Sequence, residues 1–187
     1  MISKDELKVG PGRILRRFTE REVQQLLEEW IDVYAKNAQG ANIEAYLWHT
    51  FSAGAFPSVC KREAELRYAE QVAFEIVVLS NDRVSALLTD LFPTSCNASD
   101  YLVFPKSLAW TMAFTHEDGW LGPYFAKHAR YDSLVVGDVR RSRDMQRKAL
   151  EAERAKREAG VRQELVLTTQ VVATRGIVSL AVALCTS

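Results

Sequence analysis

The segment that decides the fold is VAFEIVVL, residues 72–79. It contains a single charge, Glu75, and it is rich in β-branched residues. A strand that is covered on both faces has this nearly continuous apolar character, whereas a strand with one solvated face alternates apolar and polar residues. We therefore expect residues 72–79 to form a central strand of a sheet that has other elements packed on both sides.

Helical patterns precede this strand. Thr19 and Glu22 form the sequence motif of a capping box, and apolar residues recur at helical spacing from residue 23 to residue 34, before Gly40 offers a stop. Residues 58–70 repeat an apolar side chain at every fourth position among charged neighbours. Each pattern predicts a helix that packs one stripe against the core.

The remaining elements define the fold class. Strands are expected at residues 46–51, 101–104 and 109–116, with the last two joined as a hairpin. A short helix is expected after Asp82, because the apolar residues that follow fall at i, i+3, i+4 and i+7. Another is expected at Pro123, because proline is favoured at the first helical position. Together these elements predict an α+β fold, a small mixed or antiparallel sheet packed by helices.

Composition divides the chain into four parts. Residues 1–17 show no periodic pattern and are expected to form an N-terminal arm, and residues 18–136 form the α+β domain. Residues 137–160 are rich in charges placed for i, i+4 pairing, which predicts a long charged helix. Residues 161–187 are an apolar, β-prone tail.

Charge, cysteine content and apolar runs narrow the class of protein. Lysine plus arginine and aspartate plus glutamate both number 24, so no net field favours nucleic acid or an anionic membrane. The three cysteines include no Cys-x-x-Cys pair and are expected to be reduced thiols. The first residues lack the apolar run of a secretory signal, and the longest apolar run, residues 177–185, is far shorter than a membrane span. We expect a cytoplasmic protein that binds neither nucleic acid nor membrane.

The densest group of polar and aromatic residues is WTMAFTHEDGWLGPYF, residues 110–125. This block resembles one from a family of small bacterial proteins of unknown function, whose members carry a Thr-His-Glu turn, then Gly-Pro-Tyr-Phe, and upstream a Trp-x-x-Phe segment. The matching residues here are Thr115, His116, Glu117, Gly122, Pro123, Tyr124 and Phe125, with Trp48 and Phe51 upstream. The resemblance spans about residues 20–131 and implies no activity.

His116, Glu117 and His128 are the candidate catalytic residues. An adjacent histidine and glutamate at the end of a strand can supply a general base or two metal ligands, with His128 one helix away. In a regular strand, however, His116 and Glu117 point to opposite faces, so they converge only if the turn begins early. The alternative interpretation is that His116 closes an apolar face and bonds a backbone group.

Trp120 is the candidate binding anchor, with Asp118 and Tyr124 beside it. Three of the four tryptophans fit core faces, whereas Trp120 lies in a turn next to Asp118 and Gly119. An exposed aromatic residue in such a turn suits a protein interface. The same side chain can also fold back as a lid on the core, and the pattern does not decide between the two.

Two functions follow from these residues. The leading hypothesis is a non-enzymatic protein-binding domain, immunity-like or regulatory, with another protein as its partner. The alternative is a hydrolase or metal-dependent enzyme centred on His116, Glu117 and His128. The sequence contains no Gly-rich phosphate loop, no Gly-x-Ser-x-Gly elbow and no His-Glu-x-x-His helix, so we expect no cofactor and no stoichiometric metal ion.

Overall fold

The computed structural model describes residues 6–73, 75–117 and 119–184, and the side chains of these residues up to residue 159. Residues 1–142 and 143–187 form two compact units. The elements, in chain order, are β1 (Val9–Gly10), β2 (Ile14–Arg17), α1 (Glu20–Tyr34), α2 (His49–Ser52), β3 (Val59–Cys60), α3 (Lys61–Ala69), β4 (Ile76–Ser80), β5 (Ala86–Thr89), β6 (Ser95–Cys96), β7 (Tyr101–Pro105), β8 (Trp110–Phe114), β9 (Tyr124–Lys127) and α4 (Tyr131–Leu184).

A seven-stranded sheet organises the first unit, with the strand order β2-β5-β4-β7-β8-β9-β3. Every pairing in it is antiparallel. A separate antiparallel pair joins β1 to β6. The predicted α+β class is confirmed, and of the two sheet types that the sequence allowed the structure has the antiparallel one.

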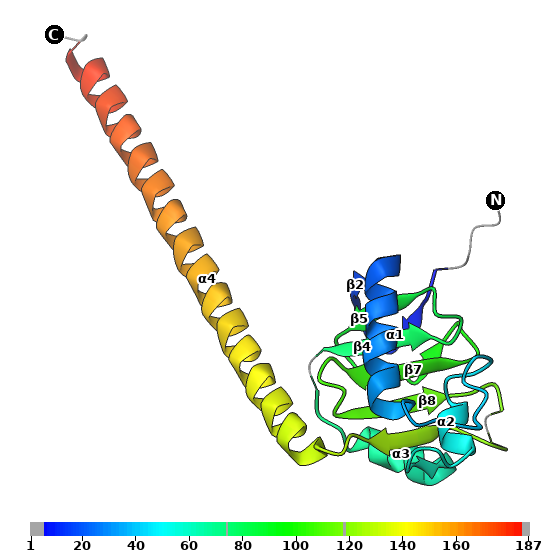
Figure 1. Ribbon diagram of the computed structural model, residues 1–187. Helices are drawn as coiled ribbons and strands as arrows, with labels where there is room; N and C mark the ends of the chain where they lie inside the picture. Colours follow the sequence, from blue (N-terminus) through cyan, green and yellow to red (C-terminus); the bar gives the residue numbers. More distant parts are fainter. Residues whose placement is uncertain (1–5, 74, 118, 185–187) are drawn as a thin grey trace, which may run out of the picture. The chain divides into compact units, whose positions relative to one another are not determined.

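Helices and loops cover both faces of the sheet, which makes the unit a three-layer structure. Figure 1 shows α1 lying across one face. One apolar cluster joins α1 and the following loop to β4 residues Val77 and Leu79, and a second joins α3 and the start of α4 to Ile76 and Val78. All five residues of β4 are buried, so the prediction of a central strand covered on both faces is confirmed for residues 76–79. The strand starts later than the expected residue 72, and Val72 is exposed.

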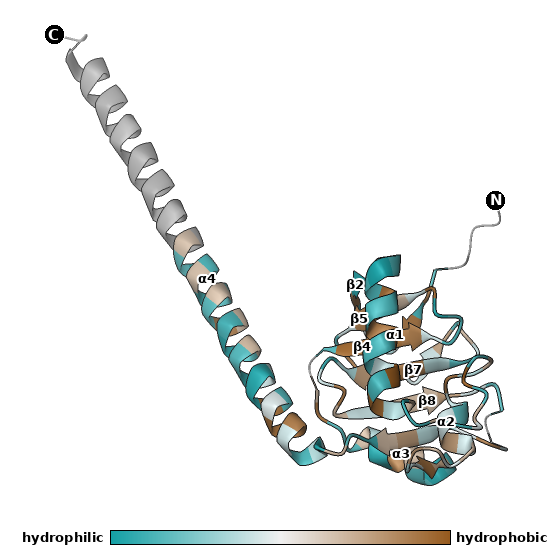
Figure 2. Cartoon of the chain, viewed as in Figure 1, coloured by the Kyte–Doolittle hydropathy of each residue, from teal (hydrophilic) through white to brown (hydrophobic). Residues whose placement is uncertain are grey.

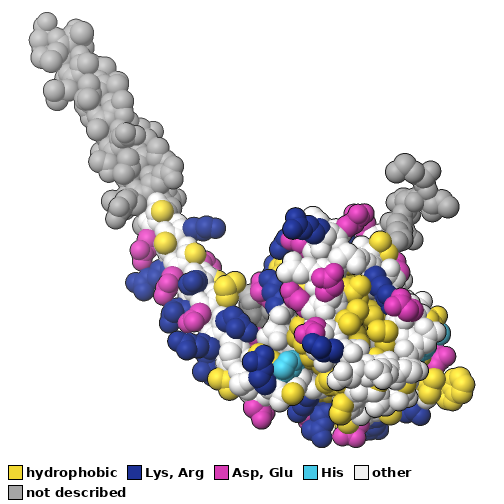
Figure 3. Space-filling model, viewed as in Figure 1, with side chains coloured by type: hydrophobic (Ala, Val, Ile, Leu, Met, Phe, Trp, Pro, Cys, Tyr) yellow, Lys and Arg dark blue, Asp and Glu magenta, His cyan; other side chains and the backbone are white. Residues whose placement is uncertain are grey.

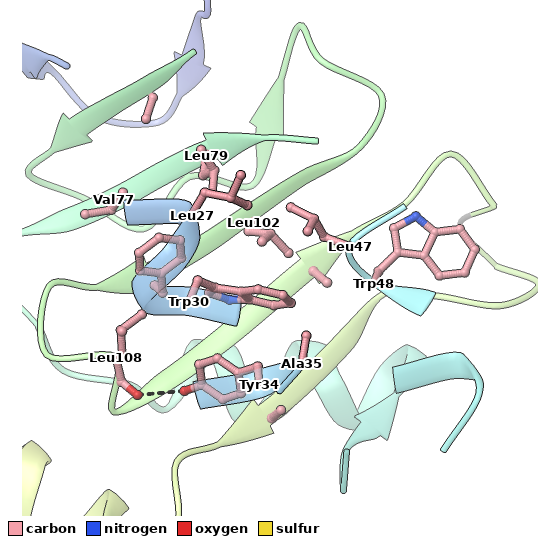
Figure 4. Packing of buried hydrophobic residues seen from close by; sticks show 14 of the residues in the cluster. Leu27, Trp30, Tyr34, Ala35, Leu47, Trp48, Val77, Leu79, Leu102 and Leu108 are labelled. Carbon is pink, nitrogen blue, oxygen red and sulfur yellow. Dashed lines mark hydrogen bonds between the residues drawn. The ribbon is translucent and has the colours of Figure 1, made fainter. Parts of the chain in front are cut away.

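Helix α1 is the main element of the first layer. Its capping box is formed as predicted, because the Glu22 carboxylate accepts hydrogen bonds from the Thr19 backbone N–H and hydroxyl. Its apolar stripe faces the sheet and its outer surface is hydrophilic (Figure 2). Trp30 is fully buried and donates from Nε1 to Thr111 Oγ1 at 3.0 Å, and the Tyr34 hydroxyl donates to the Leu108 carbonyl at 2.7 Å (Figure 4).

Several predicted elements are confirmed. The helix expected over residues 58–70 is α3, and the strands of the expected hairpin are β7 and β8, paired with Tyr101 opposite Phe114. The expected alternation is found over Trp110–Phe114, since Trp110, Met112 and Phe114 all contact the cluster on the α3 side of the sheet. The strand is shorter than the expected 109–116, and His116, expected on the same face, packs against Tyr46 and Trp48 instead.

Two predicted helices are wrong, because both segments form strands of the sheet. The apolar run after Asp82 forms strand β5, not a helix: Leu87 and Leu88 lie on opposite faces and both are buried, because the sheet is covered on both sides. Asp82 caps the β4–β5 turn by accepting the Val84 backbone N–H at 3.2 Å. The helix expected at Pro123 is strand β9, which pairs with β8 along its length.

The strand expected at residues 46–51 is also wrong. This segment turns on itself and forms the short helix α2, with backbone bonds such as His49 N–H to the Tyr46 carbonyl at 3.1 Å. Leu47 and Phe51, one helical turn apart, both enter the core on the α1 side. Aromatic residues favour strands in general, but in this segment they belong to a loop and a short helix and pack into the core.

The two ends of the chain also differ from the expectation. The segment expected to be an arm supplies strands β1 and β2, and Leu7 is buried. Residues 161–184, expected to be β-prone, belong to α4, and residues 185–187 lie outside the described part. The last proline is Pro123, so nothing interrupts α4, and extending a helix requires no new nucleation.

The described part of the chain contains no helix with the length and apolar character that crossing a membrane requires.

Candidate functional site

The candidate site lies in the turn between β8 and β9. Strand β8 ends at Phe114, two residues before His116. The turn therefore begins early enough for His116 and Glu117 to converge, and His116 Nε2 lies 3.8 Å from Glu117 Oε1. This is the condition under which the sequence allowed the two side chains to act together.

Asp100 holds the other side of His116. Its Oδ1 accepts from His116 Nδ1 at 2.9 Å and from the His116 backbone N–H at 3.1 Å. The Trp48 indole Nε1 donates to the same oxygen at 2.9 Å. The Asp100 side chain is only 10% exposed, so its position is fixed by the domain, and its bond to Nδ1 orients Nε2 toward Glu117.

Aromatic rings surround the histidine. The Tyr46 ring centroid lies 4.9 Å from that of His116, and the Trp48 ring lies 6.1 Å away. Trp48 also stacks on Tyr124, with an interplanar angle of 14°. The bond to Asp100 is the first reason why the pKa of His116 lies above its ordinary value, and Glu117 adds to the rise, while burial opposes it.

Glu117 links His116 to the tip of the turn. Its backbone carbonyl accepts N–H groups from Trp120 and Leu121, both at 3.0 Å. Its carboxylate Oε2 is buried and has no hydrogen-bond partner among the described residues. Glu117 therefore contacts the tip of the turn through its backbone carbonyl and His116 through its carboxylate.

Trp120 is the most exposed large apolar side chain of the described part, at 72%, and Leu121 beside it is 37% exposed. The alternative that Trp120 closes the core is therefore wrong. The base of the turn is rigid by contrast: Thr115 is buried, and Gly122 packs so closely on it that a Cβ at Gly122 would lie 2.4 Å from Thr115 Oγ1.

Two other predicted site residues, Tyr124 and His128, do not belong to the exposed part of this turn. Tyr124 is buried, so its ring supports Trp48 and is not a contact surface. Asp118 lies outside the described residues. His128 follows β9, and its backbone N–H donates to the Ala109 carbonyl, at the start of β8. It is thus roughly 20 Å from His116, about the length of the intervening strand.

His128 has its own local role. Its Nδ1 accepts the Arg130 backbone N–H at 2.8 Å where the chain enters α4. Burial, and secondarily the charge of Arg130, lower its pKa below the ordinary value. The predicted set of His116, Glu117 and His128 is therefore brought together only in its first two members.

A pocket of about 470 Å³ lies on the far side of Asp100. Its lining includes the carboxylates Asp82 and Asp100, serine hydroxyls and two asparagine amides, with no basic side chain. The amides bond the backbone of neighbouring loops: Asn97 Oδ1 accepts Lys8 N–H at 2.7 Å and Asn81 Oδ1 accepts Leu47 N–H at 2.9 Å. These polar groups hold the chain around the pocket in place.

Asp100 and Tyr46 are the site residues that sequence reasoning missed. A signal for Asp100 was present in the expected hairpin: once residue 101 is paired with residue 114, residue 100 lies beside residues 115 and 116. Tyr46 carried no such signal, because its segment reaches the site through a loop. Among the described residues, no group of three or more His, Cys, Asp or Glu side chains is arranged to hold a metal ion.

Fold and site together define an α+β domain built on one antiparallel sheet, with an Asp–His–Glu group beneath an exposed aromatic turn. The chain belongs to the family described as Domain of unknown function (DUF4275), whose model matches residues 9–125. The matched region contains the sheet up to Phe125, the Asp100–His116 pair and the Trp120 turn, and it ends before α4. No curated protein and no solved structure matches the chain.

The expectation of a family of unknown function is thereby confirmed. The match starts earlier than the expected residue 20, and so includes β1 and β2. The Thr-His-Glu motif and a bacterial origin stay predictions.

Proposed function

We propose that the chain is a non-enzymatic, cytoplasmic protein-binding domain, of the immunity or regulatory kind, that acts by covering the surface of another protein. The observation that carries the proposal is the 72% exposure of Trp120 at the tip of the β8–β9 turn. Tryptophan is the residue most enriched among the side chains that dominate protein interfaces. An indole left in water on a fixed support is therefore best explained by a partner that buries it.

The support beneath Trp120 strengthens this proposal. Thr115 is buried at the base of the turn, and the Glu117 carbonyl holds the Trp120 and Leu121 amides. An anchor above a closely packed base loses less conformational freedom on binding than one on a free loop, so more of its contact energy appears as affinity. Leu121 extends the apolar surface next to the indole.

Charge favours a protein over nucleic acid as the partner. The net charge is zero, and basic side chains are interspersed with acidic ones over the face shown in Figure 3. Binding to nucleic acid is dominated by contacts of Lys and Arg with phosphate, which need a concentrated basic surface.

The test uses two matched variants of the full chain. Trp120→Ala and Leu66→Ala each remove an exposed apolar side chain, from the turn and from α3 respectively, where Leu66 is 56% exposed. Photocrosslinking from a benzophenone at residue 121, in extracts of the source cells, captures the partner. Affinity is then measured with both purified proteins.

We expect one stoichiometric protein complex that Trp120→Ala weakens by roughly 2 kcal/mol or more and that Leu66→Ala leaves unchanged. Unfolding free energies of both variants should stay within about 0.5 kcal/mol of the parent chain. A complex that tolerates Trp120→Ala, or the absence of any crosslinked protein, contradicts the proposal.

A hydrolase is the second candidate, favoured by the Asp100–His116 pair. A carboxylate at Nδ1, with no hydrogen bond to a described residue at Nε2 shorter than the 3.8 Å contact to Glu117, is the arrangement of a histidine general base. Hydrolysis of an ester, amide or phosphoester that His116→Gln abolishes while folding is retained would favour this candidate. Activity that survives His116→Gln would exclude it.

A further inference from the structure

Among the described residues, Glu117 contacts both His116 and the backbone of the Trp120 turn. Its carboxylate Oε1 lies 3.8 Å from His116 Nε2, and its carbonyl accepts the N–H groups of Trp120 and Leu121. A change in the attraction between His116 and Glu117 therefore acts on the residue that positions the tip of the turn.

The other side of His116 is fixed. Asp100 accepts from Nδ1 at 2.9 Å and from the backbone N–H, and it is itself held by the Trp48 indole. Because Asp100 is largely buried, the imidazole can respond to a change of charge chiefly at Nε2, the nitrogen that faces Glu117.

Protonation decides the sign of the interaction with Glu117. The imidazolium carries an N–H at both nitrogens and lies between two carboxylates, which it attracts. The neutral ring keeps its proton on Nδ1, where Asp100 accepts it, so that a lone pair at Nε2 faces the Glu117 carboxylate. Glu117 then loses its counter-charge, while its other oxygen, Oε2, already has no partner among the described residues.

The described groups that contact the imidazole are two carboxylates and two aromatic rings. Asp100 faces it from the β6–β7 connection and Glu117 from its own turn, while Tyr46 and Trp48 pack against it from the loop before α2. His49 on α2 packs against Tyr46 and Trp48, and Tyr124 on β9 stacks on Trp48.

We propose that protonation of His116 holds the turn carrying Trp120 and Leu121 in one conformation, so that partner docking on this surface weakens as the pH rises through the titration of His116. The pH dependence of partner docking rests on the proposed function, whereas the coupling of the turn to His116 is a property of the free protein. Asp100 raises the pKa of His116 above its ordinary value of about 6.5, so the transition is expected at a higher pH than for an unperturbed histidine.

The first test needs no partner. An NMR titration of the full chain follows the ring protons of His116 together with the indole N–H and backbone amides of Trp120 and Leu121. We expect the turn signals to shift with the midpoint of His116, and amide exchange at Trp120 to accelerate above that midpoint. Turn signals that stay constant through the titration of His116 overturn the proposal.

Two variants locate the coupling. Glu117→Gln keeps the backbone carbonyl and removes the charge, so the turn should no longer follow His116 although His116 still titrates. Asp100→Asn should move the midpoints of His116 and of the turn together to lower pH. His128→Gln, at the other end of the sheet, is the control and should change neither; coupling that survives Glu117→Gln contradicts the proposed route.

The binding measurement separates the two proposals. His116 is 38% exposed, and ion pairs of such exposure contribute little, so affinity for the captured partner should fall only about two- to fivefold across the titration. If the turn titrates but Trp120→Ala leaves the complex intact, the proposed function fails and the coupling stands. If Trp120→Ala abolishes the complex but affinity and turn signals do not follow His116, the coupling fails and the proposed function stands.

Discussion

Two buried threonines of the sheet differ in whether their hydroxyl has a partner. Thr111 and Thr89 are both fully buried, but Thr111 Oγ1 accepts the Trp30 indole N–H, whereas Thr89 Oγ1 has no hydrogen-bond partner among the described residues. A buried polar group costs free energy when it is left unpaired, and a valine has nearly the same shape as a threonine.

Replacing each threonine by valine should therefore have opposite consequences. Thr111→Val leaves the Trp30 N–H unpaired and should lower the free energy of unfolding by about 1–3 kcal/mol. Thr89→Val removes an unpaired hydroxyl and should leave the free energy unchanged or raise it by up to about 1 kcal/mol. Urea denaturation of the two variants measures both effects, and equal destabilisation would show that the Trp30 bond is not what distinguishes them.

The pKa values of His116 and His128 should be shifted in opposite directions from that of an ordinary histidine. The bond to Asp100 raises the pKa of His116, while burial lowers that of His128. NMR titration should accordingly give a midpoint above about 6.5 for His116 and below it for His128.

Stability should depend on pH with matching signs. The contribution of His116 is fully present below its unfolded pKa and is lost as the pH rises through its folded pKa. The contribution of His128 is present above its unfolded pKa and is lost as the pH falls through its folded pKa. Unfolding curves of His116→Gln and His128→Gln against pH test this, and a His116 contribution that grows with rising pH would contradict the assignment.

At the scale of elements, the N-terminal segment shows how a strand can escape sequence analysis. Strand β2 is four residues long and exposed, and it is recognisable only by its pairing with β5. Leu7, which lies before β1, packs into the apolar cluster that also contains Tyr68 and Trp110. The Arg17 guanidinium donates to the Leu7 carbonyl at 2.9 Å and helps to hold the segment in place.

A matched pair of leucines tests whether this segment belongs to the folded domain. Leu7 is 5% exposed and Leu15, on β2, is 45% exposed. Leu7→Ala should lower the free energy of unfolding by about 2–4 kcal/mol, as expected for a buried leucine. Leu15→Ala should change it by less than about 0.5 kcal/mol. Thermal unfolding of both variants measures the difference. Equally small effects of the two substitutions would show that this N-terminal segment is not part of the folded domain.

At the scale of the whole molecule, the last contributions to the core of the first unit come from the start of α4. Leu134 and Val135 pack on the cluster behind the sheet, and the Tyr131 hydroxyl donates to Gln71 Oε1 at 2.8 Å. Ser107 Oγ donates to Asp138 Oδ2 at 2.5 Å. Beyond this point, up to residue 159, α4 carries mainly ion pairs along its own surface, such as Arg154 with Glu158.

Two truncations should therefore differ sharply. Ending the chain after Gly160 removes residues 161–187 and should leave the melting temperature of the domain unchanged, with less self-association in size-exclusion chromatography. Ending it after Arg130 removes the contacts of Tyr131, Leu134 and Val135, and should lower the melting temperature by about 4 °C or more, because these partly buried apolar side chains together contribute at least about 1 kcal/mol. Loss of cooperative unfolding after the first truncation would show that the tail completes the domain.

The sequence by itself determined the features that depend on near neighbours. The capping box at Thr19, the buried run at residues 76–79 and the β7–β8 hairpin all follow from residues within one element or one turn. The exposure of Trp120 did not follow from the sequence, which allowed both an exposed and a buried position. The resemblance to a family of unknown function likewise came from the sequence, and the family match over residues 9–125 confirms it at that level.

Only the tertiary structure decided the features that depend on distant partners. Leu87 and Leu88 form part of a strand because both faces of the sheet are covered, and β2 exists because β5 offers it an edge. Asp100, sixteen residues before His116, becomes its hydrogen-bond partner through the register of β7 against β8. The same local pattern of apolar residues can be compatible with a helix and with a strand. Burial and pairing with remote segments determine which of the two forms.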